Sequence, residues 1–185
     1  AALVKDKDAV QIGQRLFMTY CTVCHGSDAG GNTGFPNLRD HDWLYGGEPE
    51  MIETSIKAGR QGMMPAWEAA IGKEGVKNVT QYVLSLSGRA EANPAAAEKG
   101  KAVFATTCSA CHGPDGKGMA ALGAPNLTDK IWLYGGSVES IEKTVAEGRQ
   151  GKMPAHGDFL GDAKVHLLAA YVYSLSAKAE DTAKK

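Results

Sequence analysis

The sequence lacks a long apolar run, a substantial net charge and any alternating apolar pattern. Of its 185 residues, 43% are hydrophobic and 22% are charged, and the formal net charge is -1. No stretch approaches the length of a membrane span and no leader peptide is recognisable, so we expect no membrane segment in this chain. The charge balance gives no basis for binding nucleic acid. The missing alternation argues against strands and favours an all-α fold.

Cysteine is also scarce, and the placement of the cysteines is the most informative feature of the sequence for function. The four cysteines all lie in two pentapeptides, Cys21-Thr22-Val23-Cys24-His25 and Cys108-Ser109-Ala110-Cys111-His112. Cys-x-x-Cys-His is typical of attachment sites for c-type haem. Each thiol adds to one haem vinyl group, and the histidine that follows binds the iron. The sequence therefore predicts two covalent haem c groups, with His25 and His112 as iron ligands.

Other interpretations of the four cysteines are less well supported by the sequence. Two disulfides would leave three possible connectivities. A four-thiolate zinc site would not require a histidine after each pair, and a redox Cys-x-x-Cys pair would need a βαβ setting that the sequence does not show. Haem attachment is the interpretation that uses every residue of both motifs.

The chain is an internal duplication. Cys21 and Cys108 are 87 positions apart, and beyond the motif the step becomes 89, as for Trp43 and Trp132. We therefore predict a first domain over 1–89, a linker over 90–94 and a second domain over 95–185, of which 177–185 forms a frayed polar tail. Copies of this size need help to hold a core, which a bound haem can supply.

Each copy has the same expected layout. In the first copy we predict helices over 8–25, from Pro49 to Gly59, and over 73–87, with loops between them. Asp6 or Asp8 is expected to cap the first helix. The segment 62–65 is expected to be loop, and the second copy repeats the pattern through a helix over 165–176.

Methionine is the expected second axial ligand. Met64 and Met153 occupy matched Gly-x-Met-Pro stretches, and we predict that each binds the iron of its own copy. Met63 has no methionine counterpart and ranks below Met64. His156 lies three residues beyond Met153 and stays open as a competitor for that iron.

Several matched residues are candidate haem contacts. The carbonyls of Pro36 and Pro125 are expected to accept the Nδ1–H of the iron-binding histidines. Arginines and aromatic residues are candidates for binding the haem propionates, and for the aromatic residues core packing is an equal alternative. These candidates are Trp43, Tyr45, Arg60, Trp132, Tyr134 and Arg149.

Each half resembles class I cytochromes c in its Gly13 and Phe17, its Cys-x-x-Cys-His, its Pro-Asn-Leu and its later Met-Pro. The resemblance implies an all-α fold of two tandem class I cytochrome c domains, each wrapped around one haem, with Phe17 facing Tyr82. The Trp-Leu-Tyr-Gly-Gly, Gly-Arg-Gln-Gly-x-Met-Pro-Ala and Leu-Ser-Leu-Ser stretches are similar to the dihaem subunit of cbb3-type cytochrome oxidases, across nearly the whole chain.

That resemblance implies electron transfer in aerobic respiration, from a soluble periplasmic cytochrome c to membrane oxidase subunits, with no catalytic site in this chain. The implied location is the periplasm, on the outer face of the inner membrane. The family has an N-terminal anchor, so either an anchor was removed or this is a free dihaem carrier resembling cytochrome c4. A dihaem peroxidase and a haem-based gas sensor remain as rivals, each needing an open iron site.

Overall fold

The computed structural model describes residues 2–183 and divides into two compact units. Unit 1 combines the described parts of Ala1–Gln61 and Lys152–Lys185, and unit 2 is Gly62–Gly151. The units differ from the predicted halves 1–89 and 95–185. Each unit joins the first part of one repeat to the last part of the other.

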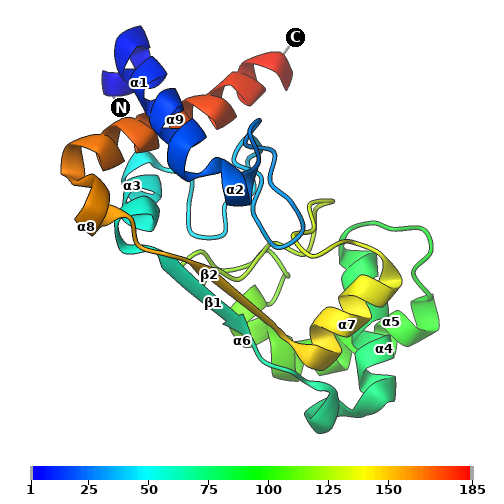
Figure 1. Cartoon of the computed structure of the whole chain (residues 1–185). Helices are drawn as coiled ribbons and strands as arrows, with labels where there is room; N and C mark the ends of the chain where they lie inside the picture. Colours follow the sequence, from blue (N-terminus) through cyan, green and yellow to red (C-terminus); the bar gives the residue numbers. More distant parts are fainter. Residues whose placement is uncertain (1, 184–185) are drawn as a thin grey trace. The chain divides into compact units, whose positions relative to one another are not determined.

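Unit 1 contains five α-helices and one 3-10 turn among the described residues (Figure 1). These are η1 (Ala2–Lys5), α1 (Lys7–Tyr20), α2 (Thr22–His25), α3 (Pro49–Ala58), α8 (Gly157–Leu160) and α9 (Asp162–Ala183). The side chain of Asp6 caps α1 by accepting from the backbone N–H groups of Asp8 and Ala9. Pro49 lies in the first turn of α3, and Gly59, at φ +72°, ends it.

Unit 2 has a similar group of helices, which follow one another along the chain in a different order. Its elements are α4 (Glu68–Leu86), α5 (Pro94–Val103), the π-helical turn η2 (Phe104–Cys108), α6 (Ser109–His112) and α7 (Val138–Glu147). Helix α4 begins earlier than predicted because a short helical segment precedes a kink at Gly72, whose φ is +71°. The predicted linker lies inside unit 2, where Asn93 caps α5 by accepting from the N–H of Ala96.

In each unit two long helices pack closely against each other, and the structure shows which helices meet. In unit 1, Gly13 of α1 lies against the carbonyl of Leu167 in α9, and Phe17 packs on Tyr171 with ring centroids 5.5 Å apart. In unit 2, Phe104 packs on Tyr82 at 5.2 Å. The expectation that Phe17 faces Tyr82 is therefore wrong, because the matched tyrosine of the other repeat occupies that place.

The prediction that no strands occur is also wrong. β1 (Arg60–Met64) and β2 (Arg149–Met153) form a two-stranded sheet. Each strand is a connection by which the chain passes from one unit into the other. Neither segment has an alternating apolar pattern. Pairing between the two matched Arg-Gln-Gly-x-Met stretches, rather than burial of apolar side chains, therefore keeps them extended.

The ends of the predicted helices also need correction. The helix predicted over 8–25 is broken at Cys21 into α1 and α2. Helix α9 extends to Ala183, beyond the predicted end near Ser176, and residues 184–185 of the predicted frayed tail lie outside the described residues. Between residues 2 and 183, no helix is both long and apolar enough to cross a membrane.

Candidate haem sites

The first motif occupies one helical turn. The N–H of Cys21 donates to the carbonyl of Phe17 at 2.9 Å, which ties the motif to α1. The N–H of His25 donates to the carbonyl of Cys21 at 3.0 Å, so both thiols and the imidazole belong to the same turn. In unit 2 the turn η2 and helix α6 place Cys108, Cys111 and His112 in the corresponding order.

The histidine of each motif is oriented by a backbone carbonyl. Nδ1 of His25 lies 3.0 Å from the carbonyl oxygen of Pro36, and Nδ1 of His112 lies 3.1 Å from that of Pro125. A carbonyl only accepts, so Nδ1 carries the proton and donates. The contact leaves Nε2 as the nitrogen available to a metal, and it fixes the angle of the ring.

Burial favours the neutral form of both imidazoles. It lowers the pKa of His25 and that of His112 from the usual histidine range, and the carbonyls of Pro36 and Pro125 oppose this shift only in part. His156 acts on His25 in the same direction as burial, lowering its pKa further. Neutral imidazole is the form that binds a metal ion.

The four thiols are free, and those of Cys21, Cys24 and Cys108 are partly buried while Cys111 is exposed. Burial, with a smaller contribution from the neighbouring thiol of the same motif, raises the pKa of Cys21 and of Cys108 to about 11. All four cysteines are free, and the two pairs lie in different units, so the disulfide alternative has no support. The described residues also include no cluster of three or more His, Cys, Asp or Glu side chains able to hold a metal, as a zinc site would need.

The methionines exchange places between repeats. Met153 packs with Cys21 against the core of unit 1, which includes Phe17 and Leu168. Met64 packs with Cys108 against the core of unit 2. The structure thus brings Met153, rather than Met64, into the unit that holds His25, which contradicts the predicted pairing within one repeat.

Met63 and Met64 differ in burial. Met63 is 75% exposed, whereas Met64 is packed against the core and lies beside a hollow lined by Pro65, Gly148 and Arg149. Met63 lines the same hollow, so burial against the core is what separates the two methionines. This geometry favours Met64 over Met63 as the candidate ligand of unit 2.

The Trp-Leu-Tyr-Gly-Gly stretches form a packed loop in each unit. Trp43 packs against the core of unit 1 and Trp132 against that of unit 2. A Cβ on Gly136 would lie 2.6 Å from Cδ1 of Trp132, and one on Gly47 would meet the indole of Trp43 as closely. The second glycine is therefore required by the close approach of the indole. Both tryptophans have a core-packing role, whatever further contact they make.

The predicted arginines make matched contacts. The guanidinium carbon of Arg60 lies 4.7 Å from the ring centroid of Tyr45, and its Nε donates to Oγ of Ser55 at 2.9 Å. Arg149 lies 4.6 Å from the ring centroid of Tyr134 and donates to Oγ1 of Thr144 at 2.9 Å. A fixed positive charge beside a tyrosine is suited to a carboxylate ligand.

Comparison with known proteins decides the family. The model of the family described as cytochrome c oxidase, cbb3-type, subunit III matches residues 8–83 and again 95–172. The chain belongs to this family. It is 54% identical over 176 residues to the cbb3-type cytochrome c oxidase subunit CcoP of Rubrivivax gelatinosus, covering 95% of this chain and 57% of that protein. It is 44% identical over 171 residues to the subunit FixP of Azorhizobium caulinodans, covering 88% of this chain and 58% of the relative.

The chain thus spans less than two thirds of the length of these relatives. The family confirms two tandem cytochrome c domains, and with them covalently bound c-type haems. The residues present fit this cofactor. Each unit supplies two thiols, a neutral imidazole held by a carbonyl, a half-buried methionine and an apolar core around them.

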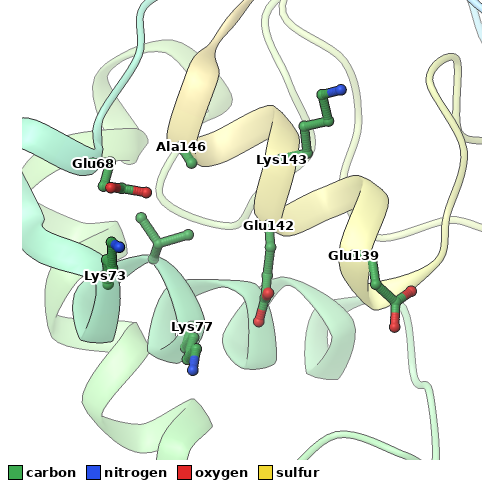
Figure 2. Close-up of a pocket in the computed structure, with 8 residues that line it drawn as sticks. Glu68, Lys73, Lys77, Glu139, Glu142, Lys143 and Ala146 are labelled. Atoms are coloured by element: carbon green, nitrogen blue, oxygen red, sulfur yellow. The ribbon is translucent and has the colours of Figure 1, made fainter.

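A second pocket of unit 2 lies away from the haem motif. Figure 2 shows it between α4 and α7, with acidic and basic side chains interspersed along both helices. Its lining residues are Glu68, Lys73, Val76, Lys77, Glu139, Glu142, Lys143 and Ala146. None of them is a candidate haem ligand, and the mixed charges are typical of a solvated helix–helix seam.

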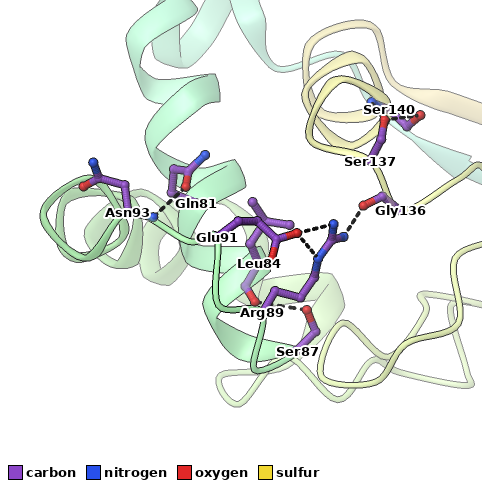
Figure 3. A network of polar contacts seen from close by, with 9 residues as sticks. All are labelled: Gln81, Leu84, Ser87, Arg89, Glu91, Asn93, Gly136, Ser137 and Ser140. Atoms are coloured by element: carbon purple, nitrogen blue, oxygen red, sulfur yellow. Dashed lines mark hydrogen bonds and ion pairs between the residues drawn. The ribbon is translucent and has the colours of Figure 1, made fainter.

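In this cbb3-family chain, sequence reasoning missed one residue next to the second site. Figure 3 shows Arg89, from the turn after α4, donating to the carbonyl of Gly136 while pairing with Glu91 at 2.5 Å. Gly136 belongs to the Trp-Leu-Tyr-Gly-Gly loop, so Arg89 anchors that loop. The matching position 89 residues later is Lys178, so the second repeat has no arginine there, and repeat matching gave no signal for this contact.

Proposed function

We propose that this chain is the dihaem part of a cbb3-type oxidase subunit, which passes electrons from a soluble cytochrome c towards the oxidase core. The observation that supports it best is the presence of two complete and matched haem sites in a chain of this family. A purely structural duplicate would not need to keep its thiols, imidazole, methionine and arginine together.

When bound, each haem supplies an iron that takes up and releases one electron without making or breaking a bond. The chain holds that iron in a fixed environment. His25 and His112 bind through Nε2 while Pro36 and Pro125 accept the other N–H. A methionine thioether as the second ligand would favour the reduced iron and raise the potential. Two tightly held ligands minimise rearrangement on electron transfer.

The remaining site residues act on the rim of the haem. Arg60 and Arg149 are held near the tyrosines by cation–π contact, and we assign them to the propionates with Tyr45 and Tyr134. Trp43 and Trp132 pack against the apolar core of each unit. These groups exclude water and neutralise propionate charge, and both effects tune the potential.

The proposed partners are a soluble cytochrome c as donor and membrane-bound oxidase subunits as acceptor, in the periplasm at the outer face of the inner membrane. The relatives carry the oxidase subunit names, which supports membrane-bound oxidase subunits as the acceptor. With a net charge of -1, docking depends on local patches rather than long-range steering, so association should have a modest dependence on salt.

The test is electron exchange between the holoprotein and a reduced mono-haem cytochrome c, followed by stopped flow. Exchange faster than oxidase turnover, into both haems, is expected. A reduced protein that binds CO at an open iron before any variant is made would instead support the peroxidase or gas-sensor alternatives. Rapid exchange without any binding to the oxidase core would support the free carrier.

A further inference from the structure

The turn that follows α4 has no counterpart at the matching place in α9. Helix α4 ends at Leu86, and Gly88, at φ +68°, turns the chain in a region of backbone conformation that favours glycine. The residue matching Gly88 is Ala177, which lies inside α9, where the helix continues to Ala183. The turn therefore brings Arg89 back toward the loops of unit 2, whereas the helical backbone of α9 carries the chain onward.

Hydrogen bonds fix this turn on both sides of Arg89. The N–H of Arg89 donates to the carbonyl of Leu84 at 3.1 Å, and the N–H of Ala92 donates to the carbonyl of Arg89 at 3.2 Å. The N–H of Asn93 donates to Oε1 of Gln81 at 2.8 Å, which ties the end of the turn to α4. The side chain of Arg89 thus starts from a backbone of defined position.

The guanidinium of Arg89 joins two parts of unit 2 that are 47 residues apart in the chain. Its Nε and one terminal nitrogen contact Oε1 of Glu91 at 2.8 Å and 2.5 Å, which orients the plane of the group. The other terminal nitrogen donates to the carbonyl of Gly136 (Figure 3). The side chain is 26% exposed, so both contacts are partly shielded from water, which strengthens them.

Gly136 is a central point of the loop that it ends. It precedes Ser137, whose side chain caps α7. A Cβ on Gly136 would lie 2.6 Å from Cδ1 of Trp132, so the indole packs directly on the anchored backbone. In the same loop the ring of Tyr134 lies 4.6 Å from the guanidinium carbon of Arg149. A fixed Gly136 carbonyl therefore restricts both the indole and the cation that we assign to a haem propionate.

We propose that Arg89 is a positioning residue for the haem of unit 2 and raises the potential of that haem alone. Through Gly136 it holds the loop that sets Trp132 and, by the contact with Tyr134, the guanidinium of Arg149. This role rests on the proposed function, in which Arg149 binds a propionate. A cation held there favours the reduced haem, and a fixed loop limits the water that would stabilise the oxidised one. The matching position in α9 is a lysine in helical backbone, so the two haems are made unequal.

Hydrogen exchange on the reduced holoprotein, followed by NMR, tests the anchor without reference to electron transfer. The N–H of Gly135 donates to the carbonyl of Trp132 at 3.2 Å and therefore reports on the loop. Arg89→Gln should speed exchange at Gly135 roughly tenfold, as expected for the loss of a hydrogen bond from a charged donor. Lys99→Gln removes an exposed charge from α5 in the same unit and should leave the exchange rate unchanged. An unchanged rate in Arg89→Gln would overturn the proposal.

The potentials of the two haems test the positioning role itself. Arg89→Gln should lower the same potential that Arg149→Gln lowers, by up to about 59 mV, which is a tenfold change in a one-electron equilibrium. Because Arg89 acts through Arg149, the two changes should not add, and Arg89→Gln should have little effect on the Arg149→Gln background. Full additivity, or a shift in the other potential, would overturn the proposal. If Arg149→Gln moves neither potential, the propionate assignment and the effect on potential both fail, and exchange at Gly135 still decides whether Arg89 holds the loop.

Glu91→Gln is the second variant, and it decides the matter if Arg89→Gln does not fold. It keeps the guanidinium but removes the carboxylate that orients it. Loss of orientation should lower the potential of the unit 2 haem, whereas a direct effect of the Arg89 charge, no longer balanced by Glu91, would raise it. A raised potential would therefore reject the positioning role. Failure of the unsubstituted protein to exchange electrons with a mono-haem cytochrome c would reject the proposed function and leave the anchor standing.

Discussion

Gly31 lies against the backbone of Phe35, so closely that a Cβ on Gly31 would be 2.5 Å from the Phe35 carbonyl oxygen. Its φ is +75°, a region that side-chain-bearing residues rarely adopt. The N–H of Gly31 also donates to the carbonyl of His25 at 2.8 Å. Gly31 therefore holds together the loop that brings the Pro36 carbonyl to the His25 imidazole.

Gly31→Ala should lower the free energy of unfolding of the holoprotein by about 2 kcal/mol, since a left-handed alanine costs roughly 1–2 kcal/mol before the clash is counted. The measurement is guanidinium unfolding followed through the haem absorbance. Gly30→Ala is the matched control, because the atoms nearest its Cβ would be those of the exposed Asp28 side chain rather than backbone. Equal losses in the two variants would contradict this role for Gly31.

Local sequence signals predicted much of the fold because they act over a few residues. Asp6, Pro49 and Gly59 have the capping and turn roles that their chemistry indicates. The haem motifs were identifiable because thioether attachment and iron ligation impose a fixed spacing on three residue types. The contact of His25 with the Pro36 carbonyl was predicted from matched positions in both repeats, whereas the contact of Arg60 with the Ser55 hydroxyl was not predicted.

Local sequence signals could not predict the exchange of helices between the two repeats, for a physical reason. Val76, Tyr82 and Val83 of α4 have the same residue types at the matching positions of α9, so Phe17 finds the same apolar face on either helix. Only positions where the repeats differ, such as Lys73 and Asp162, distinguish the exchanged helix pairing from the unexchanged one. Their effect becomes clear when both pairings are compared in three dimensions. Strand β1 was missed because its extended shape depends on β2.

Thr80 of α4 offers a test of core packing in unit 2. It is fully buried, and within residues 2–183 its Oγ1 has no hydrogen-bond partner. The matching residue in unit 1 is Ala169. Thr80→Val keeps the shape and removes the hydroxyl, so it should raise the free energy of unfolding by roughly 1 kcal/mol. Thermal unfolding of the holoprotein measures the change.

Ser174→Ala serves as the control, because its buried hydroxyl has a hydrogen-bond partner. The Ser174 hydroxyl is buried but donates to the carbonyl of Tyr171 at 2.6 Å. Its removal should therefore lower stability or leave it unchanged. A Thr80→Val protein that is less stable and has an altered haem potential would show that the hydroxyl contacts the bound haem.

Arg149 should set the potential of one haem if it binds a propionate. The oxidised haem carries one more positive charge than the reduced haem, so a nearby guanidinium disfavours oxidation. Arg149→Gln should lower the potential of one of the two haems by some tens of millivolts, where about 59 mV corresponds to a tenfold change in a one-electron equilibrium. Spectroelectrochemical titration resolves the two potentials. Lys143→Gln, which removes an exposed charge on α7, should leave both unchanged, and an equal shift in both variants would contradict the assignment.

His156 should make the two sites respond differently to loss of their methionine. It follows Met153 in the same loop and lies close enough to His25 to lower the pKa of that histidine. Its Nδ1 is 2.7 Å from the carbonyl oxygen of Pro154, so Nε2 remains available to an iron. The matching residue after Met64 is Trp67, whose indole has only an N–H donor and cannot bind a metal.

Met153→Ala should therefore give a bis-histidine haem of lower potential that does not bind CO when reduced. Met64→Ala should give an open iron that binds CO readily. The double variant Met153→Ala with His156→Ala should recover CO binding, which separates ligand replacement from simple collapse of the loop. Both residues lie on the same loop, so the outcome does not depend on which motif holds the iron. CO binding by the Met153→Ala protein equal to that of Met64→Ala would show that His156 cannot reach the iron.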